Sequence, residues 1–108
     1  MPFHDDDIND IVSTIMFLVY NGVEYENRGI VIYWGGMEYI NIHTDDFDNL
    51  LMCELTKRIH GFTVVGGGNN AVFKIGDCYI NMDYSVDFRG DNTDFTFTRL
   101  DYYDEGDQ

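Results

Sequence analysis

The sequence predicts an α+β fold with two helices packed on an antiparallel sheet, in the order α-β-β-β-α-β-β-β-β. Two stretches repeat apolar residues at intervals of three and four, as one face of a helix does. The rest consists of short runs rich in β-branched and aromatic residues, separated by glycine and asparagine turns. With 108 residues, 44% of them hydrophobic, the chain can bury one core. We therefore expect residues 1–108 to form one compact acidic domain, with residues 103–108 as a frayed tail.

The first helix is predicted to follow the run Asp5-Asp6-Asp7. Carboxylates suit a helix N-terminus, where they accept hydrogen bonds from free N–H groups and oppose the positive end of the dipole. Asn21-Gly22 is expected to end this helix. The apolar positions of its buried face are Ile8, Ile11, Val12, Ile15 and Val19.

Strands are expected over residues 23–26, 30–34 and 37–42. Asn27-Arg28-Gly29 and Gly35-Gly36 supply the turns between them, and the second pair fits a two-residue hairpin. The simplest arrangement of these three strands is an antiparallel meander.

Thr44 is the expected N-cap of the second helix, because an apolar stripe follows it and Gly61 provides a stop. The basic residues Lys57 and Arg58 fall in its last turn, where they favour the negative end of the dipole. Its first turn contains Asp45, Asp46 and Asp48, and its apolar stripe is Phe47, Leu50, Leu51, Leu55 and Ile59.

The last third predicts strands at 62–65, 71–75, 78–88 and 94–103. The strand at 78–88 alternates strictly, so its two sets of side chains should face opposite sides of the sheet. One set is Cys78, Ile80, Met82, Tyr84, Val86 and Phe88, and the other is Tyr79, Asn81, Asp83, Ser85 and Asp87.

Sites for catalysis, cofactors or metals are not expected. The glycine loop at 66–68 loosely matches a nucleotide-binding pattern, but a strand rather than a helix should follow it. Cys53 and Cys78 lie outside any paired-cysteine motif and are expected to be buried, reduced thiols. His4 and His43 each lie near aspartates, and helix capping explains those aspartates better than metal binding does.

The distinctive property is charge: 20 Asp and Glu residues against 6 Lys and Arg residues, a formal net charge of −14. Such a surface attracts a basic partner and repels nucleic acid. The expected partner-binding residues are Asp77, Asp83, Asp87, Asp91, Asp94, Asp101 and Asp104. Asp45, Asp46 and Asp48 form a second acidic candidate. A solubility coat is the alternative explanation of the same acids.

In size, charge and aromatic content the chain resembles the small acidic proteins by which phages and mobile elements block host enzymes. Anti-restriction and anti-CRISPR proteins are such groups, and some of them mimic nucleic acid. The resemblance implies a non-enzymatic inhibitor that docks into the basic channel of a CRISPR effector, nuclease or repair enzyme. The alternatives are an immunity protein against a basic nuclease toxin, and a small-molecule-binding or hydrolytic protein.

The expected location is the cytoplasm of a bacterium or infected host cell. The N-terminus has no apolar signal segment, and no apolar run approaches the ~20 residues needed to cross a membrane. No cofactor, direct nucleic-acid contact or membrane contact is expected. The oligomeric state stays open, with a dimer among the options.

Overall fold

The structure is a computed structural model that describes residues 4–21, 26–33, 44–67, 70–87 and 92–105. The strands form one antiparallel sheet in the order β1-β5-β4-β3-β2. Among the described residues, two helices on an antiparallel sheet confirm the predicted α+β class. The elements are α1 (Asp5–Asn21), β1 (Asn27–Tyr33), α3 (Thr44–Arg58), β2 (Phe62–Gly66), β3 (Ala71–Ile75), β4 (Cys78–Asp87) and β5 (Asn92–Leu100).

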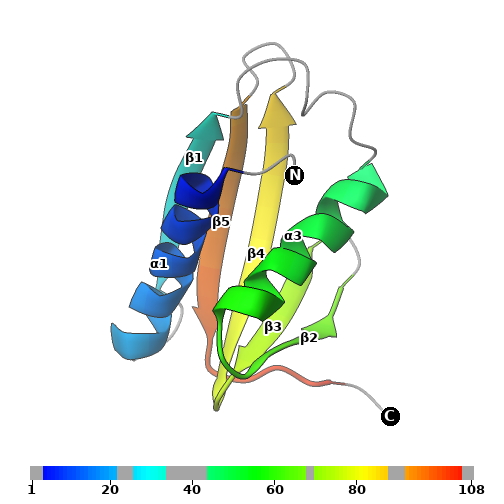
Figure 1. Ribbon diagram of the computed structural model, residues 1–108. Helices are drawn as coiled ribbons and strands as arrows, with labels where there is room; N and C mark the ends of the chain where they lie inside the picture. The colour runs from blue at the N-terminus through cyan, green and yellow to red at the C-terminus, as the bar shows by residue number, and fades with distance from the viewer. Residues whose placement is uncertain (1–3, 22–25, 34–43, 68–69, 88–91, 106–108) are drawn as a thin grey trace.

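The described elements form two layers, with both helices on the same face of the sheet (Figure 1). Helix α1 lies along β1 and β5, and α3 crosses the other half of the sheet. A single hydrophobic core fills the space between the layers. Its sheet residues are Ile32, Phe62, Phe73, Ile75, Ile80, Met82, Phe95 and Phe97.

Helix α1 buries the face that its sequence predicts. Ile8, Ile11 and Ile15 are fully buried, and Leu18 completes the stripe. Val19, which the pattern included, is only partly buried. Three aspartates occupy the first turn, as expected for the positive end of a helix dipole.

Helix α3 buries Leu51, Leu55 and Ile59, but the prediction for Leu50 is wrong because its side chain is 37% exposed. The chain leaves this helix through Gly61, whose φ of 78° is a left-handed conformation that favours glycine. The side chain of Phe47 lies outside the described residues.

The first sheet segment differs from its prediction. Asn27-Arg28-Gly29 was expected as a turn, but these residues begin β1. Strand β1 pairs along its whole length with β5, from Asn27 opposite Thr98 to Tyr33 opposite Asn92. A long-range partner thus overrides the local turn preference of asparagine and glycine. The expected strand at 37–42 and the turn at Gly35-Gly36 lie outside the described residues.

Arg99 connects the far end of the chain to the C-terminus of α1. Its Nη1 donates to the carbonyl oxygens of Leu18 (3.1 Å) and Val19 (2.9 Å). The last turn of α1 contains no basic residue of its own. Arg99 therefore provides the positive charge that favours the negative end of this helix dipole.

We predict that Arg99→Ala lowers the free energy of unfolding by about 1–2 kcal/mol, because both carbonyl contacts and the dipole interaction are lost. Arg99→Lys keeps the charge and should lose less. Urea denaturation followed by circular dichroism measures both variants. Equal midpoints for the wild type and both variants would contradict the capping role.

Candidate protein-binding surface

The face of the sheet opposite the helices presents the alternate residues of β1, β5 and β4. Residues directly opposite each other in an antiparallel pair share a face. Asp83 lies opposite Thr96, Ser85 opposite Asp94, and Asp87 opposite Asn92. The core residues Ile80, Met82, Phe95 and Phe97 occupy the intervening positions. The predicted alternation along β4 is therefore confirmed at the described side chains.

Three carboxylates lie together on this open face. Asp83, Asp87 and Asp94 are all exposed. Asp94 was expected only near a strand end, but pairing with β4 places it opposite Ser85, between Asp83 and Asp87. At about 3.3 Å per residue, the three carboxylates step along the strand direction at intervals of about 6.6 Å.

A chain of side-chain hydrogen bonds orients Asp83. Asn81 lies two residues earlier on the same face, and its Nδ2 donates to Asp83 Oδ2 at 3.0 Å. Asn70 in turn donates through its Nδ2 to Asn81 Oδ1. The amides thus hold the Asp83 carboxylate in one direction, so its negative charge has a defined position.

The other expected acids lie elsewhere or outside the described residues. Asp77 and Asp101 are exposed, but they lie at the sheet end where β4 begins and β5 finishes, and the exposed Asp104 belongs to the C-terminal segment after β5. The structure therefore separates them from the row of Asp83, Asp94 and Asp87. Asp91 lies outside the described residues. Asp45, Asp46 and Asp48 belong to the first turn of α3, and their side chains are not described.

The C-terminal segment folds back over the open face beside β2 and β3. Tyr79 Oη donates to Glu105 Oε2 at 2.7 Å, and the ring centroids of Tyr79 and Tyr103 are 5.8 Å apart. A Cβ added to Gly66 would lie 1.8 Å from the Tyr103 hydroxyl. Any larger residue at position 66 would therefore have to displace the Tyr103 ring, which rests against the backbone there.

Val72 is buried on the face of the sheet that the C-terminal segment covers. Its register partners Gly66 and Asn81 place it on the open face, yet it is 4% exposed and lies outside the helix-side core. We attribute its burial to the adjacent Tyr103. Residues 103–105 of the segment expected to fray thus pack on the sheet. Residues 106–108 lie outside the described part of the chain.

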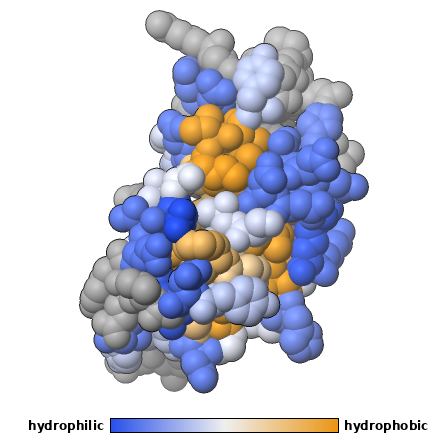
Figure 2. Space-filling model, turned by 90° about the vertical axis from the view of Figure 1, so that its left-hand side faces the viewer, coloured by the Kyte–Doolittle hydropathy of each residue, from blue (hydrophilic) through white to orange (hydrophobic). Residues whose placement is uncertain are grey.

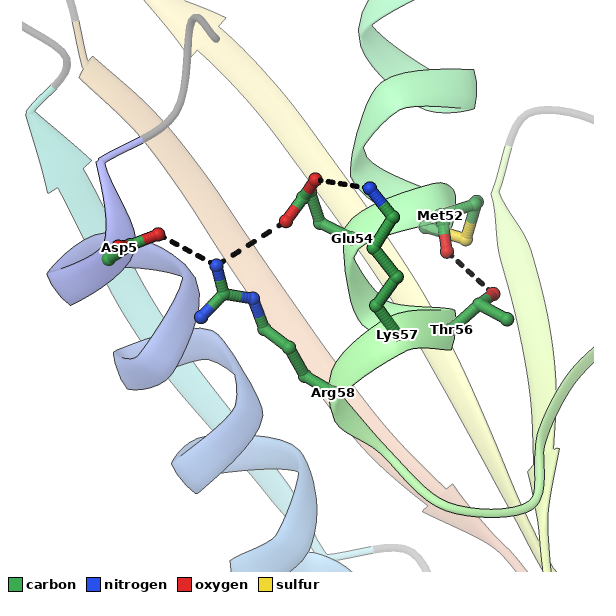
Figure 3. A network of polar contacts seen from close by, with 6 residues as sticks. All are labelled: Asp5, Met52, Glu54, Thr56, Lys57 and Arg58. Atoms are coloured by element: carbon green, nitrogen blue, oxygen red, sulfur yellow. Dashed lines mark hydrogen bonds and ion pairs between the residues drawn. The ribbon is translucent and has the colours of Figure 1, made fainter.

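Positive charge is concentrated at the contact between the two helices (Figure 3). Arg58 Nη2 donates to Asp5 Oδ1 (2.8 Å) and Glu54 Oε2 (3.3 Å), and Nη1 donates to Asn9 Oδ1 (3.0 Å). Lys57 Nζ also lies 3.3 Å from the other Glu54 oxygen. Glu54 is buried, so these two cations compensate the cost of removing its charge from water.

Some of the aspartates of α1 take part in contacts within the folded protein. The hydrogen bond from Arg58 occupies Asp5, and it raises the pKa of Arg58 above its ordinary value. Burial raises the pKa of Asp7, and the positive charge of His4 opposes that shift. Asp5 of this cluster therefore helps to join the two helices, which leaves the open sheet face as the better candidate for recognition.

A hollow of about 270 Å³ between α1 and β1 is lined by Ser13, Thr14, Phe17, Arg28 and Gly29. Figure 2 looks at this side of the molecule and shows hydrophobic surface bordered by hydrophilic residues. The Arg28 guanidinium stacks 3.8 Å from the centre of the Phe17 ring and pairs with Glu26 at 3.5 Å. Because the protein itself engages this cation, we do not place the functional site here.

The thiol prediction is wrong for Cys53, which is exposed on α3, and Cys78 is only half-buried. Position 53 lies beside Leu51 and Leu55 in sequence, but helix geometry turns it away from their stripe.

The strand expected after the glycine loop is confirmed as β3. Within the described ranges, no three His, Cys, Asp or Glu side chains group as metal ligands would. In the same ranges, neither helix has the length and apolarity to cross a bilayer.

We predict that Tyr79 ionises at higher pH than an ordinary tyrosine. The hydrogen bond to Glu105, followed by burial and nearby negative charge, raises its pKa. Because the pKa of Tyr79 is higher in the folded protein, the contact contributes its full stabilisation below the unfolded pKa of about 10. This stabilisation is lost as the pH rises through the pKa of the folded protein. Absorbance titration of the phenolates should show one late step that Tyr79→Phe removes.

Two glycine variants provide the control for the C-terminal contact. Gly66→Ala should displace Tyr103 and move the late Tyr79 step towards the ordinary value. Gly67→Ala should leave it unchanged, because a Cβ there meets only Asn70 O at 3.7 Å. Identical titrations for both variants would contradict the packing of Tyr103 on the sheet.

We predict that thermal stability rises as salt increases to about 0.15 M, where the Debye length falls to about 8 Å. The reason is repulsion among the acids on one face. The double variant Asp83→Asn with Asp87→Asn removes two of these charges and should show a smaller rise. Calorimetry at matched pH measures both proteins, and a melting temperature independent of salt would contradict a clustered acidic face.

Comparison with known proteins leaves the chain without an assigned family. No protein-family model matches it, and neither a curated protein nor a solved structure does.

Proposed function

We propose that this protein is a non-enzymatic inhibitor that docks the open sheet face into the basic nucleic-acid-binding channel of a larger enzyme. The observation that carries this proposal is the row of Asp83, Asp94 and Asp87 on the face that the helices leave uncovered. A basic channel recognises fixed negative charge, and the sheet supplies it in a regular arrangement.

The spacing of the row supports mimicry of a phosphate backbone. One strand of B-DNA carries a charge roughly every 3.4 Å along the helix axis. The three carboxylates recur at regular intervals of about 6.6 Å along the strand direction. A channel that lines up Lys and Arg side chains along a phosphate backbone can therefore meet this row of charges.

The short aspartate side chain favours this role energetically. A carboxylate one methylene from a paired strand loses little conformational freedom when it binds, so less entropy opposes association. The amide of Asn81 fixes Asp83 further. Displacing bound counterions and steering a basic partner towards the face then favour fast association.

The proposed targets are nucleic-acid enzymes of bacterial defence or repair, such as a CRISPR effector or nuclease, in the cytoplasm of the cell that a phage or mobile element enters. Net charge supports a protein target over a nucleic-acid target, because a chain with net charge −14 repels phosphates. A gel-shift assay that shows tight binding of this protein to DNA or RNA would contradict the proposal.

We predict that Asp83→Lys with Asp87→Lys weakens partner binding by about tenfold or more, mainly by slowing association. The partner is first captured from a bacterial lysate and identified by mass spectrometry. Its association and dissociation rates are then measured with wild type and variants by surface plasmon resonance.

The matched control is Asp77→Lys with Asp101→Lys, which changes the net charge equally at the other end of the sheet. It should weaken binding less. Equal losses for both double variants would mean that total charge, and not the row on β4 and β5, determines binding. No loss for either would leave the acids as a solubility coat.

A further inference from the structure

The docking face contains an apolar and aromatic border beside the acidic row. Strand β1 pairs with the free side of β5, with Val31 opposite Asp94 and Tyr33 opposite Asn92. The Val31 and Tyr33 side chains are 61% and 65% exposed. Three strands thus present one continuous patch: Gly29, Val31 and Tyr33 from β1, Thr96, Asp94 and Asn92 from β5, and Asp83, Ser85 and Asp87 from β4.

Tyr33 on β1 lies one strand away from Asp94 on β5 and two strands away from Asp83 and Asp87 on β4. Neighbouring strands are about 4.8 Å apart, and strand side chains project roughly perpendicular to the sheet. The Tyr33 ring therefore lies about two strand spacings from Asp87 and diagonally adjacent to Asp94. The patch offers an exposed ring and fixed negative charges to the same partner surface.

This combination distinguishes two kinds of nucleic-acid channel. A surface for duplex DNA meets phosphates and groove edges, because the faces of the bases are stacked on one another. A groove for single strands combines Lys and Arg side chains for the phosphates with aromatic platforms on which unstacked bases lie. The patch has a counterpart for each part of a single-strand groove: carboxylates for phosphates and Tyr33 for a base.

We propose that the patch occupies a single-strand-binding groove, with Tyr33 stacked where a base would stack and the aspartates placed where phosphates would bind. This inference rests on the proposed function and specifies its target surface. Val31, two residues before Tyr33 on the same face of β1, would contact apolar groove surface beside the aromatic side chain on which Tyr33 stacks. The carboxylates favour a groove lined with Lys and Arg side chains, and the exposed Tyr33 ring favours a groove that also contains aromatic side chains.

The test uses two purified probes of known chemistry. One is an OB-fold single-stranded-DNA-binding protein loaded with fluorescein-labelled oligothymidine, and the other is a helix-turn-helix repressor loaded with its labelled duplex. Fluorescence anisotropy follows displacement of each DNA by this protein at low and at physiological salt. The wild type should displace the oligothymidine at a concentration at least about tenfold lower than it needs for the duplex.

Variants separate the ring from the charge. Tyr33→Ala should raise the concentration needed to displace oligothymidine by about tenfold, and Tyr33→Phe should retain wild-type displacement because it keeps the ring. Tyr20→Ala is the matched control, since Tyr20 is 80% exposed at the end of α1, away from the patch. Circular dichroism verifies that each variant is folded.

The outcomes distinguish the two proposals. One outcome is that the protein displaces both DNAs equally, that Tyr33→Ala leaves this displacement unchanged, and that Asp83→Lys with Asp87→Lys abolishes it. This outcome would overturn the single-strand inference while supporting the acidic docking face. Displacement of neither DNA would contradict both proposals. Selective displacement of oligothymidine, lost with Tyr33→Ala and kept with Tyr33→Phe and Tyr20→Ala, supports the inference.

Discussion

The two helices of the described ranges pack on one face of the sheet formed by β1 to β5, and the other properties of this protein depend on that arrangement. A strand alternates its side chains between two faces, so burying Ile80 and Met82 against the helices forces Asp83 outward. The same rule applied to β5 buries Phe95 and exposes Asp94. One hydrophobic layer therefore stabilises the fold and also determines where the carboxylates of the opposite face lie.

Three described arginines lie on the helix side of the sheet, whereas Lys74 lies on the open face, 5.6 Å from the centre of the Tyr79 ring. Arg58 joins the two helices through Asp5 and the buried Glu54, and Arg99 binds the carbonyl end of α1. Arg28 stacks on Phe17 at the α1–β1 contact. These described arginines stabilise the helix layer, and Asp83, Asp94 and Asp87 are exposed on the opposite face. The contacts that stabilise the helix layer and the face proposed for recognition therefore lie on different sides of one sheet.

Local patterns predicted what depends on local periodicity. The alternation of β4, the Ile8–Ile11–Ile15 stripe and the Gly61 stop all follow from spacing and backbone preference. The position of Asp94 between Asp83 and Asp87 does not, because strand register is a long-range property. Nor could spacing reveal that Asn27–Gly29 extends β1, that Tyr103 packs against Gly66, or that Glu54 is buried. Each of these depends on a partner distant in sequence or on the packing of the two layers.

The central claim is that the open face, and not the acidic helix ends, recognises basic surfaces. Two-dimensional NMR of the labelled protein during titration with a short oligolysine peptide tests it most directly, because every backbone amide reports separately. The account predicts that the largest chemical-shift changes fall on β4, β5 and β1, around Asp83, Asp94 and Val31. Changes concentrated at Asp5–Asp7 in the first turn of α1, or spread evenly over all acidic residues, would contradict it.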